Sequence, residues 1–133
     1  MSYAAAAALQ TAIFQRLSTA PALAGVAVHD ALPPSPPGLF VLIGPEEVRD
    51  ASDKLAEGAD HRLVLSVISD AEGFLAAKTV SVLISDLMAG PMPMPALSRG
   101  RLVRLSFDRA VARRIGEGAV RRIDLTFRAR IEL

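Results

Sequence analysis

The sequence predicts an α+β fold: a mostly antiparallel sheet of four to five strands, with two helices covering one face. Apolar side chains occupy every second residue over 123–131, so a strand there has one dry face and one charged face. A second alternating run, 101–113, precedes it. Stretches with helical spacing at 3–18 and after residue 69 supply cover for the dry face. The expected order of elements is αβββαββ.

The first helix is expected over residues 3–18. Alanine favours helix, and Leu9, Ile13 and Leu17 recur every fourth residue, which places them on one face. Pro21 ends the helix because proline cannot continue the hydrogen-bond ladder. The apolar N-terminal run has no basic residue before it and is broken well short of a membrane span. Neither a signal peptide nor a membrane anchor is therefore expected.

Strands alternate with irregular connections in the next part of the chain. Residues 26–29 are a short strand candidate, and residues 39–43 form an apolar run of the length of a buried strand. The prolines of 31–38 enforce an extended, partly mobile link between them. The acidic stretch 45–60 has weak periodicity and is interpreted as a long mobile loop, a type of segment that often makes contacts. Residues 62–69 are expected to form a strand.

A second helix is expected after residue 69. Ser69 and Glu72 have capping-box spacing, and Gly90 with Pro91 ends the helix. Residues 89–100, with alternating prolines and methionines, are expected to be mobile. They form either a stiff connector on their own domain or a surface that moulds to a partner. The apolar stripe expected to face the sheet consists of Ala76, Val80, Leu83, Ile84 and Leu87.

The last two strands are expected to form a hairpin, because Gly116-Glu117-Gly118 lies between the two alternating runs. In the first run a strict alternation places Arg104, Ser106 and Asp108 on the wet face. The dry face is expected to hold Val103, Leu105, Phe107 and Val111.

Composition indicates a single domain over residues 1–133. A chain of this length buries a core without disulfides or a structural metal. Hydrophobic residues make up 51% of the chain but aromatic residues only 5%, so the core is expected to be aliphatic. There is no cysteine, which removes disulfides, thiolate nucleophiles and Cys-ligated zinc, and fits a reducing compartment.

Charge is unevenly distributed along the chain. Residues 1–98 carry five basic and ten acidic side chains, whereas residues 99–133 carry ten arginines and four acids. Such a split lets the basic part attract nucleic acid, or face the acidic part of another copy. The alternative is that folding interleaves the two parts into an ordinary mixed surface, because position in the sequence does not set position in space.

No motif for catalysis or for a bound metal is recognised. His29 and His61 lie outside metal-ligand spacing and are interpreted as structural residues. The serines form no nucleophile elbow, and Gly116-Glu117-Gly118 is too short for a phosphate cradle. No catalytic residue, cofactor or metal ligand is therefore assigned.

The candidate interface or bore residues are charged or methionine side chains that the expected sheet and loops expose. The arginines of the hairpin share its wet face. Without interleaved aromatics or a helix-turn-helix pattern, a solvated or subunit-contacting face is favoured over a specific nucleic-acid site. The candidates are Arg104, Arg122, Arg128, Arg130, Glu46, Glu47, Asp50, Asp53, Met92 and Met94.

Short segments spread over nearly the whole chain carry a resemblance to a known family. They are Ala8–Leu17, Val28-His29-Asp30, 39–44, Gly58-Ala59-Asp60-His61, Ser69-Asp70, Ala76-Ala77-Lys78, Leu102–Leu105 and Leu125–Ala129. In this order they resemble the small tail-terminator, or tail-completion, proteins of long-tailed phages and phage-like gene transfer agents. The Met-Pro run 91–95 and the lack of a Trp in the central strand depart from that family.

The resemblance implies a structural protein and not an enzyme. Proteins of this family form a hexameric ring on the last ring of major tail tube subunits and stop further polymerisation. The opposite face meets the head–tail connector or stopper protein, and DNA passes through the bore without sequence-specific binding. The resemblance also implies assembly in the bacterial cytoplasm, a final place at the head–tail junction, and no membrane partner. Residues 45–60 and 90–98 are expected to contact neighbouring rings.

Two other classes of function remain open. One is a basic-faced nucleic-acid-binding module, or a neck or adaptor protein of the same particle. The other is a small enzyme whose site forms only between subunits. A ring-sized native mass favours the terminator, whereas salt-sensitive binding of a monomer or dimer to DNA favours the nucleic-acid module.

Overall fold

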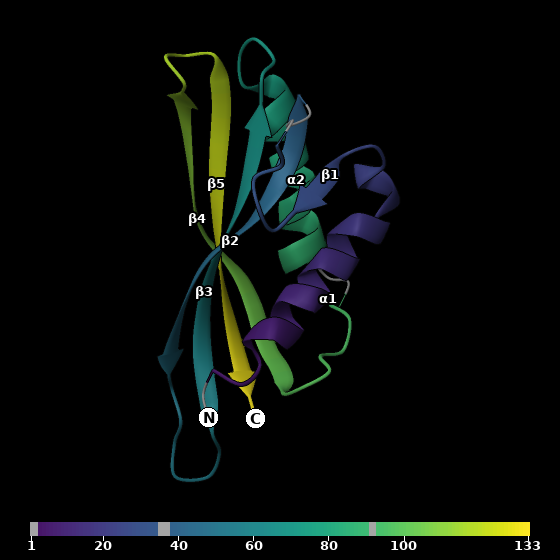
Figure 1. Ribbon diagram of the computed structural model, residues 1–133. Coiled ribbons are helices and arrows are strands. Elements are labelled where there is room, and N and C mark those ends of the chain that lie inside the picture. The colour runs from purple at the N-terminus through teal and green to yellow at the C-terminus, as the bar shows by residue number, and fades with distance from the viewer. Residues whose placement is uncertain (1–2, 35–37, 91–92) are drawn as a thin grey trace.

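The computed structural model describes residues 3–34, 38–90 and 93–133 and has the expected αβββαββ order (Figure 1). A short 3-10 turn, η1 (Pro21–Leu23), follows the first helix. The helices are α1 (Ala6–Thr19) and α2 (Leu75–Ala89). The strands are β1 (Ala27–His29), β2 (Leu39–Asp50), β3 (Gly58–Ser69), β4 (Arg101–Ile115) and β5 (Val120–Glu132).

The five strands form one sheet in the order β1-β2-β3-β5-β4. The short strand β1 is parallel to β2, and every other neighbouring pair is antiparallel. The expectation of a mostly antiparallel sheet of four to five strands is confirmed. The sheet twists strongly along its length (Figure 1). Because β4 runs opposite to β2, the turns of the β2–β3 and β4–β5 hairpins lie at opposite ends.

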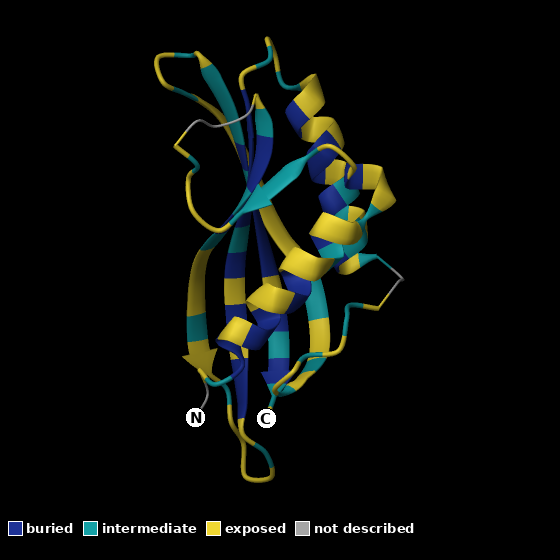
Figure 2. Ribbon diagram, turned by 45° about the vertical axis from the view of Figure 1, so that its right-hand side comes forward, coloured by how far each residue is buried: buried dark blue, intermediate teal, exposed yellow. Residues whose placement is uncertain are grey.

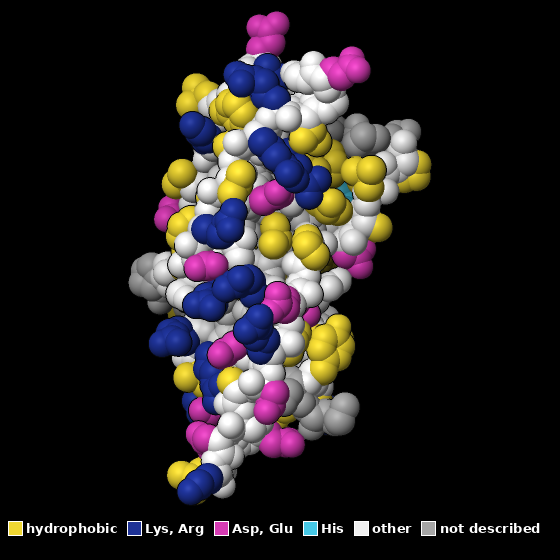
Figure 3. Space-filling view, turned by 90° about the vertical axis from the view of Figure 1, so that its left-hand side faces the viewer, with side chains coloured by type: hydrophobic (Ala, Val, Ile, Leu, Met, Phe, Trp, Pro, Cys, Tyr) yellow, Lys and Arg dark blue, Asp and Glu magenta, His cyan; other side chains and the backbone are white. Residues whose placement is uncertain are grey.

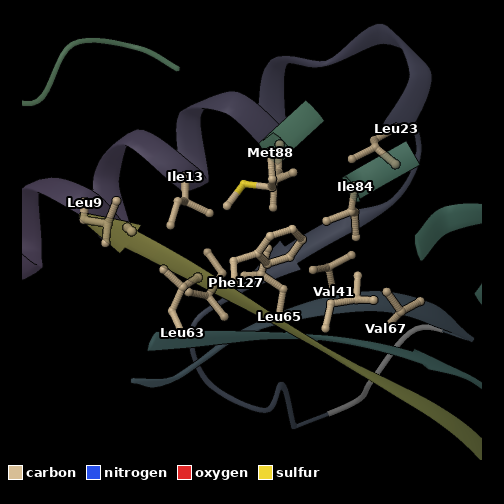
Figure 4. Packing of buried hydrophobic residues seen from close by; sticks show 14 of the residues in the cluster. Leu9, Ile13, Leu23, Val41, Leu63, Leu65, Val67, Ile84, Met88 and Phe127 are labelled. Atoms are coloured by element: carbon tan, nitrogen blue, oxygen red, sulfur yellow. The ribbon is translucent and has the colours of Figure 1, made fainter. Parts of the chain in front are cut away.

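Both helices lie on one face of the sheet (Figures 1 and 2). The core between them is mainly aliphatic, with Leu9 and Ile13 of α1, Ile84 and Met88 of α2 and Phe127 of β5 pointing toward one another (Figure 4). In β5 the alternation holds: Ile123, Leu125, Phe127, Ala129 and Ile131 are all buried. We call the opposite, helix-free side of the sheet the open face.

The alternation in β4 differs from the expected one. Bulges between Leu102 and Arg104, and between Phe107 and Arg109, each insert one residue and shift the following side chains to the other face. Val111 therefore lies opposite Asp124 on the open face, which corrects its expected place on the dry face. Leu105 keeps its expected place opposite the buried Ala129.

The interpretation of residues 45–60 as a long loop is wrong in its bounds. Strand β2 continues to Asp50 and β3 begins at Gly58, so only residues 51–57 connect them. A shift in register between Ile43 and Glu46 interrupts the alternation, and beyond it the strand extends past the helices. Polar side chains are tolerated on both faces there, which removes the periodicity that indicates a strand.

The start of α2 also differs from the expected capping box. The helix begins at Leu75, and Ser69 Oγ instead accepts a hydrogen bond from the Ala71 N–H at 3.1 Å. This bond belongs to a tight turn that precedes the helix, so Glu72 lies before the first residue of α2 and takes no part in a capping box. The buried side of α2 consists of Ala77, Val80, Ser81, Ile84 and Met88, so only Val80 and Ile84 of the expected stripe are fully buried.

Candidate functional site

The open face of the sheet gathers the arginines of the C-terminal part of the chain. Figure 3 shows this face, with Lys and Arg side chains in a band along its length and Asp and Glu side chains between them. Alternation along the paired strands places the side chains of one face in register. Among those on the open face are Arg49, Arg62, Arg101, Arg104, Arg109, Arg113, Arg122, Arg128 and Arg130, together with Glu47, Asp60, Asp124 and Glu132.

Arginines stand directly opposite one another on neighbouring strands of this face. Arg128 of β5 pairs with Arg62 of β3, and Arg130 pairs with Arg104 of β4. Like charges in directly opposed positions destabilise a sheet unless other groups compensate them. The open face therefore carries repulsion that a neighbouring acidic or phosphate-bearing surface would relieve.

Asp124 is the centre of the most connected cluster on the open face. Its Oδ1 accepts hydrogen bonds from Ser66 Oγ at 2.6 Å and from Arg122 Nε at 2.9 Å, and its Oδ2 accepts one from Arg113 Nη2 at 3.2 Å. Arg122 Nη2 also donates to Ser66 Oγ at 3.1 Å. Burial alone would raise the pKa of Asp124, but the hydrogen bonds from Ser66 and Arg122 and the charges of both arginines hold it below its usual value.

Arg130 fixes the connection between β2 and β3. Its Nη1 donates to the Ala51 carbonyl at 2.7 Å and lies 3.7 Å from Asp60 Oδ1, and only 20% of its side chain is exposed. A Cβ at Gly58 would lie 2.5 Å from Arg130 Nη2, so the glycine leaves room for the guanidinium. Arg122 is similarly enclosed, with 23% of its side chain exposed. The expectation that these two arginines are freely exposed is wrong.

Three arginines of the open face have no ion pair or hydrogen bond within the described part of the chain. They are Arg104, Arg109 and Arg128, and all three are exposed. Arg109 borders a shallow hollow of about 390 Å³ whose other walls include Arg62, Arg113 and Asp124. The charge of Arg62 is only weakly compensated, because its Nε lies 3.9 Å from Asp108 Oδ2.

The acidic candidates make local contacts around the end of β2. Glu46 lies beside the buried His61, with Oε2 at 3.2 Å from Nδ1. Glu47 accepts a hydrogen bond from Arg49 Nε at 2.7 Å, which with the charge of Arg49 lowers its pKa. Asp50 Oδ1 accepts one from Ser52 Oγ at 2.7 Å.

Asp53 organises the loop 51–57. Its Oδ1 accepts hydrogen bonds from the N–H groups of Leu55 at 2.8 Å and Ala56 at 2.9 Å. These two bonds lower the pKa of Asp53, because they favour the charged carboxylate. Leu55, at the tip of this turn, is 96% exposed.

The methionine candidates lie after α2. Met92 falls outside the described residues, and Met94 packs half-buried against the core. Arg16 of α1 donates from Nε to the Leu87 carbonyl at 3.2 Å and from Nη2 to the Pro93 carbonyl at 2.6 Å. The part of the segment at Pro93 and Met94 is thus tied to its own domain. Sequence reasoning missed Arg16 because a lone arginine on a helix carries no signal of such a contact.

Comparison with known proteins places this fold in a family. A family model described as Tail completion protein gp17 matches residues 11–132. The chain belongs to this family. It is also similar to a solved chain described as "Virion of native gene transfer agent (GTA) particle", with 52% identity and a TM-score of 0.90 over 99% of this chain and 100% of that chain. No match was found among curated proteins.

Membership in the tail completion family makes this a structural protein and not an enzyme. Within residues 3–34, 38–90 and 93–133, no group of three His, Asp or Glu side chains is placed to hold a metal ion. None of the described helices is long and apolar enough to cross a membrane. The resemblance inferred from the short segments is confirmed.

Replacing Asp124 by asparagine is expected to lower the free energy of unfolding by on the order of 1 kcal/mol at pH 7, since hydrogen bonds to a charged group are lost. Because the folded-state pKa of Asp124 is depressed, its stabilisation is complete above the unfolded-state pKa of about 4 and is lost as the pH falls below it. Urea unfolding of both proteins between pH 7 and pH 3 measures the difference, which should shrink on acidification. The exposed Glu47→Gln is the matched control and should change stability less. A difference independent of pH would contradict this role for Asp124.

Proposed function

We propose that this chain is the tail terminator of a phage-like particle. Its copies form a hexameric ring that caps the major tail tube, stops tube polymerisation and provides the joint to the head–tail connector or stopper protein. DNA passes through the bore without sequence-specific binding. The observation that carries the proposal is the match to a chain of a native gene transfer agent virion, which covers both chains almost completely at 52% identity.

The distribution of charge supports a ring. A ring closed by rotation needs two different patches on each copy that fit one another. Strand β4 carries five arginines and one aspartate, while the end of β2 carries Glu46, Glu47 and Asp50 against one arginine. The loop 51–57 lies at one end of the domain (Figure 1), where it is available to a neighbouring ring. The segment after α2, although tied to its own domain at Pro93 and Met94, is the second proposed contact with a neighbouring ring. On this proposal the protein is assembled in the bacterial cytoplasm and ends at the head–tail junction.

A neck or adaptor protein with a nucleic-acid-binding face is the second candidate. The excess of arginine on the open face favours it, because phosphate groups would compensate the opposed Arg62 and Arg128. In that case the purified protein would bind DNA as a monomer or dimer and release it as salt is raised. A terminator would instead occur as a ring on tail tubes.

Deletion of the gene in the producing system tests the proposal. Tails of uncontrolled length, or tails that fail to join heads, are expected, and electron microscopy of the particles measures both. Expression of the intact chain from a plasmid should restore uniform, joined tails. Normal joined particles in the absence of the protein would rule out the terminator function. Uniform tails that join heads but lack DNA would support the adaptor instead.

A further inference from the structure

The sheet has two outer edges without a paired strand in the described part of the chain. On one side β1 pairs only with Phe40, Val41 and Leu42, so β2 has no outer neighbour from Ile43 to Asp50. We call this stretch the β2 edge. On the other side β4 pairs only with β5, and we call its outer side the β4 edge. Unpaired edges are templates for pairing with another chain.

The directions of the strands allow these two edges to meet by rotation. From β2 through β3 and β5 to β4, each strand is antiparallel to the one before it. Four alternating strands bring β4 to a direction opposite to that of β2. If the next copy is generated by rotation about an axis along the strands, its β2 edge lies antiparallel to β4. A regular antiparallel ladder can then continue from copy to copy.

Charge favours this pairing over a symmetrical one. The β2 edge carries the acidic side chains Glu46, Glu47 and Asp50, whereas the β4 edge is rich in arginine, including Arg104 and Arg109. Pairing β4 with β4 of a second copy would oppose arginine to arginine, which destabilises a sheet. The bulges of β4 leave Arg104–Phe107 and Arg109–Ile115 as regular stretches for pairing.

We propose that the β4 edge of one copy pairs with the β2 edge of the next copy, so that the sheets of neighbouring copies are continuous around the ring. This inference rests on the proposed ring and names the contact that closes it. It assigns a role to the outer side of the acidic end of β2, whose inner side pairs with β3.

Engineered cysteines test the contact, because the chain has none of its own. Through the pairs Glu47–Arg62, Arg62–Arg128 and Arg128–Ser106, position 47 is level with position 106 on the open face. Within one chain these positions are separated by three strand spacings, roughly 14 Å. A disulfide needs Cα atoms within about 7 Å, so a bond between them can form only between copies.

Glu47→Cys is combined in turn with Arg104→Cys, Ser106→Cys and Arg109→Cys, which covers neighbouring registers. Each pair is introduced into the producing system, and purified particles are oxidised and run on a non-reducing gel. One pair should convert most of the monomer band into covalent multimers up to the full ring. The control pair is Glu47→Cys with Val82→Cys, an exposed position on α2, and it should stay monomeric.

Three results would overturn the inference. The first is intact particles whose cysteines react with a maleimide while none of the three pairs cross-links. The second is dimer formation by a β4 cysteine alone, which indicates β4–β4 pairing. If a cysteine pair blocks assembly, a charge swap is used in its place. Glu47→Arg alone and Arg104→Glu alone should each lower the particle yield, and the two together should restore it. The third overturning result is a double variant that fails to restore the yield. Any of these leaves the terminator proposal standing if deletion still gives uncontrolled tails.

Discussion

Replacing Phe127 by alanine is expected to lower the free energy of unfolding by about 3–5 kcal/mol. Phe127 is completely buried in the middle of β5 and points into the core between the sheet and the two helices (Figure 4). Its ring also meets that of Phe107 edge to face, with centroids 5.9 Å apart. Loss of the ring removes buried apolar surface and leaves a cavity that a close-packed core fills only partly. The loss is a large share of the roughly 5–15 kcal/mol that stabilises a domain.

Urea unfolding of the free subunit at fixed protein concentration measures this effect, since assembly would add concentration-dependent stability. Phe14→Ala is the matched control, because that ring lies 45% exposed on the outer side of α1. It should change the unfolding free energy by about 0.5 kcal/mol or less. Similar losses for the two variants would show that the covered side of the sheet has been misplaced.

Much of the fold follows from regular patterns in the sequence. In β5 the buried apolar side chains fall on every second residue without interruption, so the sequence predicts both the strand and its covered face. In β4 the first bulge, after Leu102, brings Leu105 and Phe107 to the covered side, and the second moves Val111 to the open face. A bulge depends on how two strands pair, so it cannot be recognised from the composition of one strand alone. Strict alternation therefore misplaces Val111.

The same limit applies to the candidate site on the open face, because the sequence alone does not give the partners of its arginines. The sequence places Arg122, Arg128 and Arg130 on one face of a strand, and the structure agrees. Which of them is held within the subunit depends on neighbours far away in the chain: Ser66 for Arg122 and Ala51 for Arg130. Those neighbours are set by the register between strands. Arg128 lies opposite Arg62 of β3 and Ser106 of β4 and has no ion pair or hydrogen bond among the described residues, so its availability for assembly becomes visible only when the pairing is known.

The register divides the arginines into two sets with opposite expected behaviour. The free set is Arg104, Arg109 and Arg128, which have no partner among the described residues. The held set is Arg122 and Arg130, which donate charge-assisted hydrogen bonds to Asp124 and to the Ala51 carbonyl. Changing the held set to serine should lower the unfolding free energy by about 1–3 kcal/mol, because partly buried acceptors lose their donors.

Changing the free set to serine should act on assembly and leave the subunit stable. Each change at these exposed positions is expected to alter the unfolding free energy by about 0.5 kcal/mol or less. Two of them remove repulsion, since Arg104 opposes Arg130 and Arg128 opposes Arg62. In particles the same changes should cause a large loss of tails joined to heads, counted by electron microscopy. The reason is that they remove the positive charge that attracts a neighbouring acidic or phosphate-bearing surface.

The lysine versions of the free set separate charge from shape. Lysine keeps the positive charge but not the planar, multiple donors of arginine. If the lysine variants give joined particles at near-normal levels, positive charge alone attracts the neighbouring surface, as a steering or bore-lining role requires. Loss with lysine as well as serine would mean that the guanidinium groups make specific contacts with a neighbouring protein. Normal particles with serine would show that the open face takes no part in assembly, and that its opposed arginines are merely tolerated.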